Sequence, residues 1–409
     1  MAAVATRPHA RTSVPFVVVA SALFVLLLNG NLPTPLYGVY QDRFGFSGTQ
    51  LTLIFATYTI ALIPSLLVFG QLSDRVGRRP VIVGGLGGAA VGLILLAAAQ
   101  STPWLYAARA VQGLALGAAV GTIPAALVEL EPSGDHGRAA LAAVLGQSGG
   151  SAAGPLVAGA LAQWAPAPRQ LCYIVALAVT VLTAIAVLRI SEPRQATGEW
   201  RPQKPSVPEA IRVPFARASL TCGCVWAVGA LFLSVVPSYA AELLATSDLA
   251  LLGAISAMML TMACVAQAVS LRGAMTPRRA QAAGLGLLIV GIAALVAAFP
   301  LRALPLVVAA AVLAGTGLGF GYFGSQTQIN QLAPGERRGE VTAAFISCIY
   351  TGVSVTAIGT GLLSDATSLF TAVAVAGSVV ASIAAATIAW HLAAARQRRA
   401  TDQARVARL

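Results

Sequence analysis

An arginine lies inside one of the long apolar segments of this chain. Arg109 begins the run Arg-Ala-Val-Gln-Gly, which places Gln112 and Gly113 just after it. A charged side chain within a membrane span is costly and usually functional. Such a guanidinium can hold an anionic substrate or a neighbouring carboxylate. The alternative is that Arg109 reaches out to the membrane surface, because Trp104 lies only five residues before it.

A second group of charges lies in the short connection GQLSDRVGRRP, which occupies residues 70–80. Gly70 and Gly77 permit a tight turn and a close approach of two helices. Asp74 can accept backbone N–H bonds or pair with a base. A generic basic hairpin would need neither glycine nor aspartate at these places. Three arginines anchor the loop on the inner side of the membrane: Arg75, Arg78 and Arg79.

Carboxylates are candidates for proton coupling, which usually uses an acid at membrane depth. No acid of this chain lies clearly in the middle of an apolar segment. Glu129 is a candidate to pair with the basic loop. Coupling would then run through acids near the membrane surfaces, or through Arg109 and a titratable substrate. The acids near the two surfaces are Asp42, Glu242, Asp248 and Asp365 outside, and Asp74, Glu129 and Glu131 inside.

Glycines recur every four residues in another apolar segment, at Gly146, Gly150 and Gly154, and Gly159 follows. Such a stripe lets helices touch backbone to backbone. Pro155 removes one backbone hydrogen bond and can kink the helix. Ordinary small-residue packing would explain the same spacing.

Polar, aromatic and methionine side chains within the apolar segments are candidates to contact a solute. Met258 and Met262 would form a soft, adaptable wall. The alternative for the polar side chains is hydrogen bonding between helices or anchoring at the membrane surface. The other candidates are Asn29, Asn31, Gln112, Gln147, Trp226, Gln267, Tyr322 and Tyr350.

The elements that position these residues are membrane helices. Of the 409 residues, 57% are apolar and 10% are charged, against roughly 25% charged in soluble proteins. A span needs roughly 20 mostly apolar residues. Twelve such segments are predicted: Val14–Tyr37, Gly48–Phe69, Pro80–Ala99, Trp104–Val128, Ala139–Trp164, Leu171–Leu188, Val213–Pro237, Leu249–Val269, Ala280–Phe299, Ala303–Gln326, Val341–Leu363 and Leu369–His391.

The basic residues fix the orientation of these spans. With the N-terminus in the cytoplasm, all of the 26 Lys and Arg fall in cytoplasmic segments except Arg43, Arg109, Arg169 and Arg302. An even number of spans then puts both termini in the cytoplasm. The net charge of +12 suits the anionic inner leaflet. The bases recur between apolar runs rather than in one patch, and aromatics are few, so nucleic acid is not expected as a partner.

An internal repeat divides the chain. Gly113 and Gly117 match Gly315 and Gly319 at an offset of 202 residues, and other matches follow in order. We therefore expect an all-α membrane protein of twelve helices in two pseudo-symmetric halves, with a solute site between them. The expected divisions are residues 1–190 and 214–392 for the halves, 191–213 for a cytoplasmic linker and 393–409 for a basic cytoplasmic tail.

The motifs resemble three signatures of the major facilitator superfamily. The loop at residues 70–79 resembles G-x-x-x-D-R-x-G-R-R, which in that family helps latch the cytoplasmic face. The run from Arg109 resembles R-x-x-Q-G, whose arginine is implicated in proton coupling. The segment from Gly150 to Gly159 resembles G-x-x-x-G-P-x-x-G-G, associated with antiporters, with Ala158 in place of one glycine. The second-half loop keeps Arg278 and Arg279 but has no aspartate.

The resemblance implies a twelve-span drug:proton antiporter that exports hydrophobic or amphipathic molecules. A proton-coupled carrier of one metabolite, such as a sugar or an organic acid, is the alternative. No phosphate-binding loop occurs, and the only lysine is Lys204, so an ion gradient is the expected energy source, with no cofactor and no metal. Neither a catalytic constellation nor room for a soluble domain is present, so no enzyme is expected. We expect a monomer in a bacterial inner membrane.

Overall fold

The computed structural model describes residues 13–69, 72–192, 204–273 and 275–406, and the side chains of these up to residue 394. Within these ranges every regular element is a helix, and the first six predicted spans correspond to the following elements. They are α1 (Val14–Asn31), η1 (Thr34–Leu36) and α2 (Tyr37–Phe44); α3 (Gly48–Phe69), followed by the short α4 (Leu72–Val76); α5 (Arg78–Ala97); α6 (Thr102–Ala119) and α7 (Thr122–Leu130); α8 (His136–Val144), η2 (Leu145–Gly149) and α9 (Gly150–Trp164); and α10 (Leu171–Arg189).

The last six predicted spans follow the same plan. They are η3 (Glu209–Ile211), α11 (Arg212–Ser234) and α12 (Val236–Leu244); α13 (Leu249–Ser270); α14 (Pro277–Leu301); α15 (Leu304–Leu332); η4 (Gly335–Arg337) and α16 (Arg338–Ala366); and α17 (Leu369–Val406). The tail predicted from residue 393 is helical as far as it is described, because α17 continues to Val406.

Eleven helices of the described chain are long and apolar enough to cross a membrane. The remaining predicted span, Ala139–Trp164, corresponds to α8, η2 and α9. The three follow one another without a gap, and η2, over Leu145–Gly149, is a π-helical stretch that joins α8 to α9. The first predicted span continues past Pro33 and Pro35 as η1 and α2. The all-α membrane fold predicted from the sequence is confirmed.

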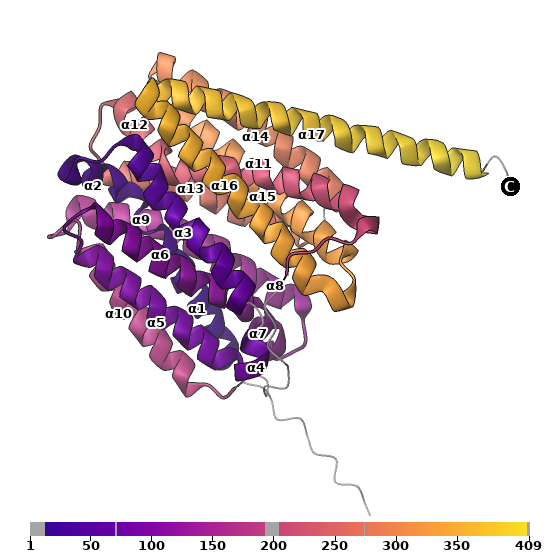
Figure 1. Cartoon of the computed structure of the whole chain (residues 1–409), viewed down its shortest axis with the longest axis horizontal. Helices are drawn as coiled ribbons and strands as arrows, with labels where there is room; N and C mark the ends of the chain where they lie inside the picture. Colours follow the sequence, from indigo (N-terminus) through magenta and orange to yellow (C-terminus); the bar gives the residue numbers. More distant parts are fainter. Residues whose placement is uncertain (1–12, 70–71, 193–203, 274, 407–409) are drawn as a thin grey trace, which may run out of the picture.

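The spans alternate in direction, so the bundle has two distinct ends. The loop end contains the connection around Asp74, the turn at 131–135 and the start of α8. The far end contains the turns at 45–47, 98–101, 165–170, 245–248 and 367–368. Figure 1 shows α2 and α12 together at the far end, α4, α7 and α8 at the loop end, and α17 extending beyond the bundle.

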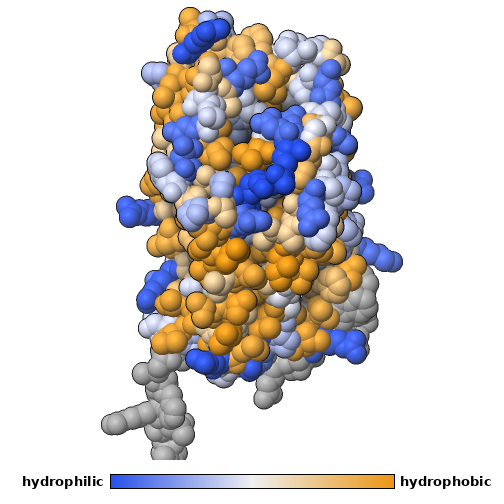
Figure 2. Space-filling view, turned by 90° about the vertical axis from the view of Figure 1, so that its left-hand side faces the viewer, coloured by the Kyte–Doolittle hydropathy of each residue, from blue (hydrophilic) through white to orange (hydrophobic). Residues whose placement is uncertain are grey.

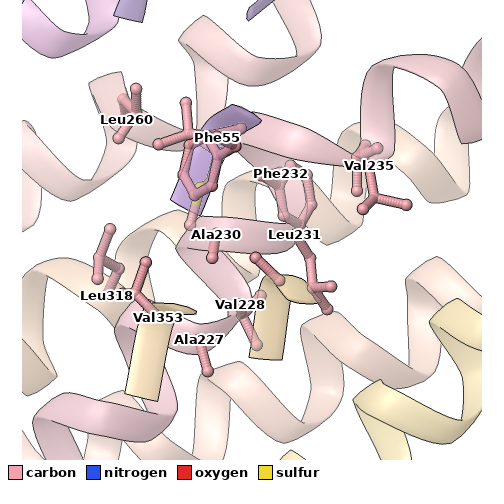
Figure 3. Packing of buried hydrophobic residues seen from close by; sticks show 14 of the residues in the cluster. Phe55, Ala227, Val228, Ala230, Leu231, Phe232, Val235, Leu260, Leu318 and Val353 are labelled. Carbon is pink, nitrogen blue, oxygen red and sulfur yellow. The ribbon is translucent and has the colours of Figure 1, made fainter. Parts of the chain in front are cut away.

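Apolar side chains lie on the outside as well as in the core. Figure 2 shows wide apolar areas on one face of the molecule, and residues such as Leu182 and Val355 are two-thirds exposed. Lipid solvates such surfaces directly. Inside, α11 is the most enclosed of the spanning helices. Its side chains lie among Phe55 of α3, Leu260 of α13 and Val353 of α16 (Figure 3).

Candidate functional site

Arg109 is turned into the protein, where its side chain is only 1% exposed. Its Nη1 donates to the carbonyl oxygen of Gly30 at 2.7 Å and to Oε1 of Gln112 at 2.8 Å. The guanidinium carbon lies 4.3 Å from the centre of the Tyr58 ring. Tyr37 is also close enough to interact with its charge. The side chain therefore does not reach out to the membrane surface.

Gln112, from the same helix as Arg109, and Asn29, from α1, hold this arrangement in place. Nε2 of Gln112 donates to the carbonyl oxygen of Asn29 at 3.2 Å, and Nδ2 of Asn29 donates to the Thr180 hydroxyl at 2.9 Å. These bonds join α6 to α1 and α1 to α10. Two buried polar atoms of this cluster, Nε of Arg109 and Oδ1 of Asn29, have no hydrogen-bond partner within the described part of the chain. Buried polar groups are normally paired, so this cluster is incompletely satisfied.

The positive charge of Arg109 is not balanced by a carboxylate in the described chain. Arg109 forms no ion pair with any acid of the described chain. Burying a charge without a counter-charge is expensive. The carbonyl, amide and aromatic groups around Arg109 compensate for part of that cost.

Arg109 lines a small cavity of about 50 Å³ between the first six and the last six spans. Trp226 and Tyr350 come from the last six spans, and Asn31 and Ser151 from the first six. The lining contains donors and aromatic rings but no carboxylate. The full lining is Leu27, Asn31, Phe55, Tyr58, Thr59, Arg109, Ser151, Trp226, Ala230, Leu233, Leu260, Tyr350 and Val353.

A larger cavity of about 530 Å³ lies on the loop-end side and shares Trp226 and Tyr350 with the small one. Its polar lining consists of amides and hydroxyls, and tyrosine is its only ionisable residue type. The rings of Trp226 and Tyr322 are perpendicular in a T-shaped contact, with their centroids 5.9 Å apart. The lining residues are Val120, Gly121, Pro124, Ala140, Ala143, Val144, Gln147, Trp226, Gln267, Leu271, Tyr322, Phe323, Gln326, Thr327, Asn330, Thr342, Ile346, Ile349 and Tyr350.

Two hydrogen bonds made by residues that line this larger cavity join the two sets of spans. Nε2 of Gln147 donates to the Tyr322 hydroxyl at 3.4 Å. Nε2 of Gln267 donates to the Ser148 hydroxyl at 2.9 Å. These polar groups lie next to apolar walls, which is the usual composition of a small-molecule site.

Most of the candidate solute contacts therefore line one of these two cavities, but four do not: Asn29, Gln112, Met258 and Met262. Asn29 is buried among hydrogen bonds to α6 and α10, although Asn31, two residues later, lines the small cavity. Met258 and Met262 line neither of these two cavities, so the methionine wall stays a prediction. Successive positions on a helix face different directions, and the apolar pattern carried no sign of which direction is inward.

The charged loop is held together by Arg78. Its Nη1 lies 2.8 Å from Oδ1 of Asp74, and its Nη2 lies 3.1 Å from Oε1 of Glu129. The carboxylate of Glu192 accepts from the backbone N–H groups of Arg78 and Arg79 at the start of α5. Gly77 has a φ of +96°, which favours glycine.

This loop is built entirely from residues that precede the last six spans. Arg75 is exposed and Arg79 is half-buried, whereas Gly70 lies outside the described residues. A side chain at residue 77 would also meet the Glu192 carboxylate at 2.8 Å. Glu192 was not among the residues predicted from the sequence, because it follows α10 and only the fold brings it to the loop.

Replacing Arg78 with alanine is expected to lower the thermal stability of the detergent-solubilised protein. The change leaves two carboxylates, on Asp74 and Glu129, near each other without their shared base. Removing one partner of a buried ion pair costs about 3–5 kcal/mol, and the partial exposure of both acids reduces this to about 1–3 kcal/mol. The midpoint of thermal unfolding measures it. Arg75→Ala, in the exposed part of the loop, is the control, and equal shifts for the two variants would contradict the prediction.

Glu131, also at the loop end, has a structural role, because hydrogen bonds hold its carboxylate in the turn before α8. Its carboxylate accepts from the backbone N–H groups of Asp135 and Ser133 at 2.7 and 2.8 Å, and from the Ser133 hydroxyl at 2.9 Å. Burial alone would raise the pKa of Glu131, but these hydrogen bonds and Arg138 lower it below its ordinary value. Glu131 therefore stays ionised and caps the turn before α8.

The glycine stripe brings α9 into backbone contact with two helices. A Cβ on Gly154 would lie 2.6 Å from the carbonyl oxygen of Leu28 in α1. A Cβ on Gly159 would lie 2.5 Å from the carbonyl oxygen of Leu249 at the start of α13. In addition, the carbonyl of Pro155 lies against Gly253 of α13. The stripe therefore joins α9 both to α1 and, across the molecule, to α13.

The far end is closed by contacts that the sequence did not predict. Backbone N–H groups of Gly48 and Thr49 donate to the Asp365 carboxylate at 2.8 and 2.9 Å. The N–H of Leu249 donates to Oε1 of Gln163 at 2.9 Å. A pocket of about 210 Å³ lies beside Asp365.

These two contacts are related by the internal repeat. Gln163 and Asp365 are 202 residues apart, the offset found in the sequence. Each accepts from the first N–H groups of a helix in the other set of spans, α3 for Asp365 and α13 for Gln163. The repeat offset, applied to the polar residues at span ends, would have found the pair.

Comparison with known proteins gives the family. The sequence model described as the Major Facilitator Superfamily matches residues 19–357. The methyl viologen resistance protein SmvA of Salmonella typhimurium is 39% identical over 124 residues, which are 29% of this chain and 24% of that protein. The puromycin resistance protein pur8 of Streptomyces alboniger is 32% identical over 153 residues, 36% of this chain and 30% of that protein. The matched stretch thus spans less than a third of either relative.

The fold matches over nearly the whole chain. A crystal structure of a bacterial homolog of the human lysosomal transporter Spinster, described as inward-facing and unoccupied, has a TM-score of 0.76. The match covers 96% of this chain and 98% of that one at 16% identity. At this identity the likeness concerns the fold.

Proposed function

Because this chain belongs to the major facilitator superfamily, we propose that it exports hydrophobic or amphipathic small molecules in exchange for protons. The chain is a multi-pass membrane transporter and not an enzyme. The observation that supports export of amphipathic molecules is the cavity of about 530 Å³, with its aromatic and amide lining and no formal charge. The resistance proteins SmvA and pur8 are consistent with this.

The distribution of basic residues supports an orientation with the loop end in the cytoplasm. The cavity then faces the cytoplasm while the contacts of Asp365 and Gln163 close the far end. We take the protein to be a monomer in a bacterial inner membrane, with both termini cytoplasmic and with halves at residues 1–190 and 214–392. The conformation described would be the one that loads substrate from inside.

Alternating access requires the two ends to open in turn. Opening the far end means breaking the bonds at Asp365 and Gln163 and closing the large cavity. The loop around Asp74 then has a role as a cytoplasmic latch, because it lies at the end that must close. Arg109 and Gln112 lie between the two ends and are the coupling candidates, together with Glu129 at the loop.

The proposal is tested in a bacterium that lacks its own efflux pumps. Cells expressing the protein are expected to accumulate several-fold less of amphipathic antibiotics and fluorescent dyes, and a proton uncoupler is expected to remove the difference. Trp226→Ala, which opens both cavities, is expected to weaken export of the same compounds. The control is Trp164→Ala, an exposed tryptophan at the far end. Unchanged accumulation across the panel would count against drug export.

A carrier for a single metabolite is the second candidate. It is favoured by one observation, the absence of an acid paired with Arg109 in the described chain. Profiling the solutes in the growth medium, with and without expression, distinguishes the candidates. A single enriched metabolite together with no effect on the dye panel would favour this second function.

A further inference from the structure

The small cavity around Arg109 presents hydrogen-bond donors. Arg109 is 1% exposed and lines it, and its Nε has no partner. The hydroxyl groups of Tyr58, Ser151 and Tyr350 also line it or adjoin it, and within the described chain they form no hydrogen bond. Asn31 uses only one of its two amide hydrogens, on the carbonyl of Leu27.

The same cavity lacks a negative charge. None of its lining residues is an acid, and the ionisable groups that face Arg109 are the phenols of Tyr37 and Tyr58. A buried guanidinium in a low-dielectric site attracts an anion strongly and repels a cation. A planar carboxylate is the group that best matches guanidinium geometry.

The lining of the larger cavity indicates the chemistry of the rest of a ligand whose anionic group lies in the small cavity. Its walls are apolar, aromatic and amide, and it contains no formal charge. Trp226 and Tyr350 line both cavities, so a molecule that occupies both contacts these two side chains. Aromatic rings bind other aromatic rings by offset or edge-to-face contact.

We infer that the substrate is an aromatic weak organic acid whose carboxylate lies against Arg109 and whose ring system lies against Trp226 and Tyr350. This rests on the proposed export function and narrows its substrate class. The substrate supplies the negative charge that the protein lacks around Arg109. Cations are disfavoured at the same place, because no acid of the lining would compensate for their charge.

Binding to the purified protein tests this without any transport. Equilibrium dialysis with radiolabelled 2-naphthoate is compared with 2-naphthamide, which has the same shape but no charge. We expect the carboxylate to bind about tenfold or more tightly than the amide, the factor given by a hydrogen bond to a charged group. Equal affinities in the unmodified protein would overturn the inference.

Variants assign the preference to Arg109. Arg109→Gln is expected to remove the preference for the carboxylate while retaining binding of the amide, which also shows that the variant is folded. Arg109→Lys keeps the charge and is expected to retain part of the preference. Arg75→Gln, which removes an exposed positive charge from the loop, is the matched control. Loss of the preference in Arg75→Gln but not in Arg109→Gln would also overturn the inference.

The outcomes for the two proposals are distinct. Arg109-dependent naphthoate binding, combined with no export of any compound by cells, would leave the inference standing and contradict the export function. Uncoupler-sensitive export of amphipathic cations, combined with equal binding of naphthoate and naphthamide, would support the export function and contradict the inference.

Discussion

Gly150→Ala is expected to prevent most of the protein from reaching its folded state. A Cβ at this position would lie 2.2 Å from the carbonyl oxygen of Phe24 and 2.9 Å from the Phe24 Cα. Both are backbone atoms of α1, so no side-chain rotation relieves the clash. The two helices must move apart, and overpacking of this kind costs about 1–3 kcal/mol or more. Because α9 also contacts α13 through Gly159, the displacement extends across the molecule.

The measurement is the yield of monodisperse protein in detergent by size-exclusion chromatography, with its thermal midpoint. Gly149→Ala is a matched control at the neighbouring residue. Its Cβ would be no closer than 3.7 Å to the Phe24 ring, which is ordinary contact. Both residues have helical backbone angles, so alanine is intrinsically favourable at each. If the two variants gave the same yield and midpoint, close packing of α1 on α9 would not explain the glycine stripe.

Asp365→Ala is expected to shift the protein toward a conformation with an open far end. The carboxylate accepts two backbone N–H groups at the start of α3, where the helix dipole also favours a negative charge. A hydrogen bond to a charged group is worth about 1.5–3 kcal/mol, so the closed-to-open ratio should fall about 10- to 100-fold. Asp365→Asn keeps the shape without the charge and should give an intermediate shift.

Gln163, the counterpart of Asp365 in the internal repeat, should contribute less to the stability of the closed far end. Gln163 bonds only the N–H of Leu249, and the next N–H groups of α13 are already capped by Asp248 within the same chain segment. Gln163→Ala is therefore the matched control, with a smaller expected shift in the same direction. A larger shift for Gln163→Ala than for Asp365→Ala would contradict this account.

Distances between spin labels across the far end measure both variants. Gln100→Cys and Ser247→Cys place labels on exposed far-end residues of the first and the last six spans. Cys348, the exposed native cysteine of the described chain, is replaced by serine beforehand, since the other cysteines there are buried. Electron–electron double resonance should show a longer-distance population that is larger in Asp365→Ala than in the parent. An unchanged distribution would show that Asp365 does not hold the far end closed.

The sequence predicted the membrane spans because spanning is a local requirement. Lipid offers no hydrogen-bond partners, so each helix must satisfy its own backbone over roughly 20 apolar residues. That stretch is visible in the sequence without knowledge of any neighbour. The predicted span Ala139–Trp164 corresponds to α8, η2 and α9, but nothing in the sequence indicated the π-helical stretch at Leu145–Gly149. The glycine motif there indicated close helix contact, though not which helices are in contact.

The sequence could not show which polar residues face a cavity. In a soluble helix the polar side marks the solvent, but here the lipid-facing and core-facing sides are both apolar. Asn29 and Asn31 therefore looked equivalent, and only the packing of α1 against α6 and α10 separated them. For the same reason the sequence could not show whether Met258 and Met262 face a cavity, and they line neither of the two cavities at Trp226.

Tertiary structure alone decided how Arg109 is compensated and which end is closed. The sequence marked Arg109 by its cost in a membrane, but its partners, Gly30 and Tyr58, come from other helices. Asp365 lies 317 residues from Gly48, and such a pair forms only when the two sets of spans meet. Local apolar composition determines that a helix crosses the membrane, whereas long-range packing between helices determines what its polar residues touch.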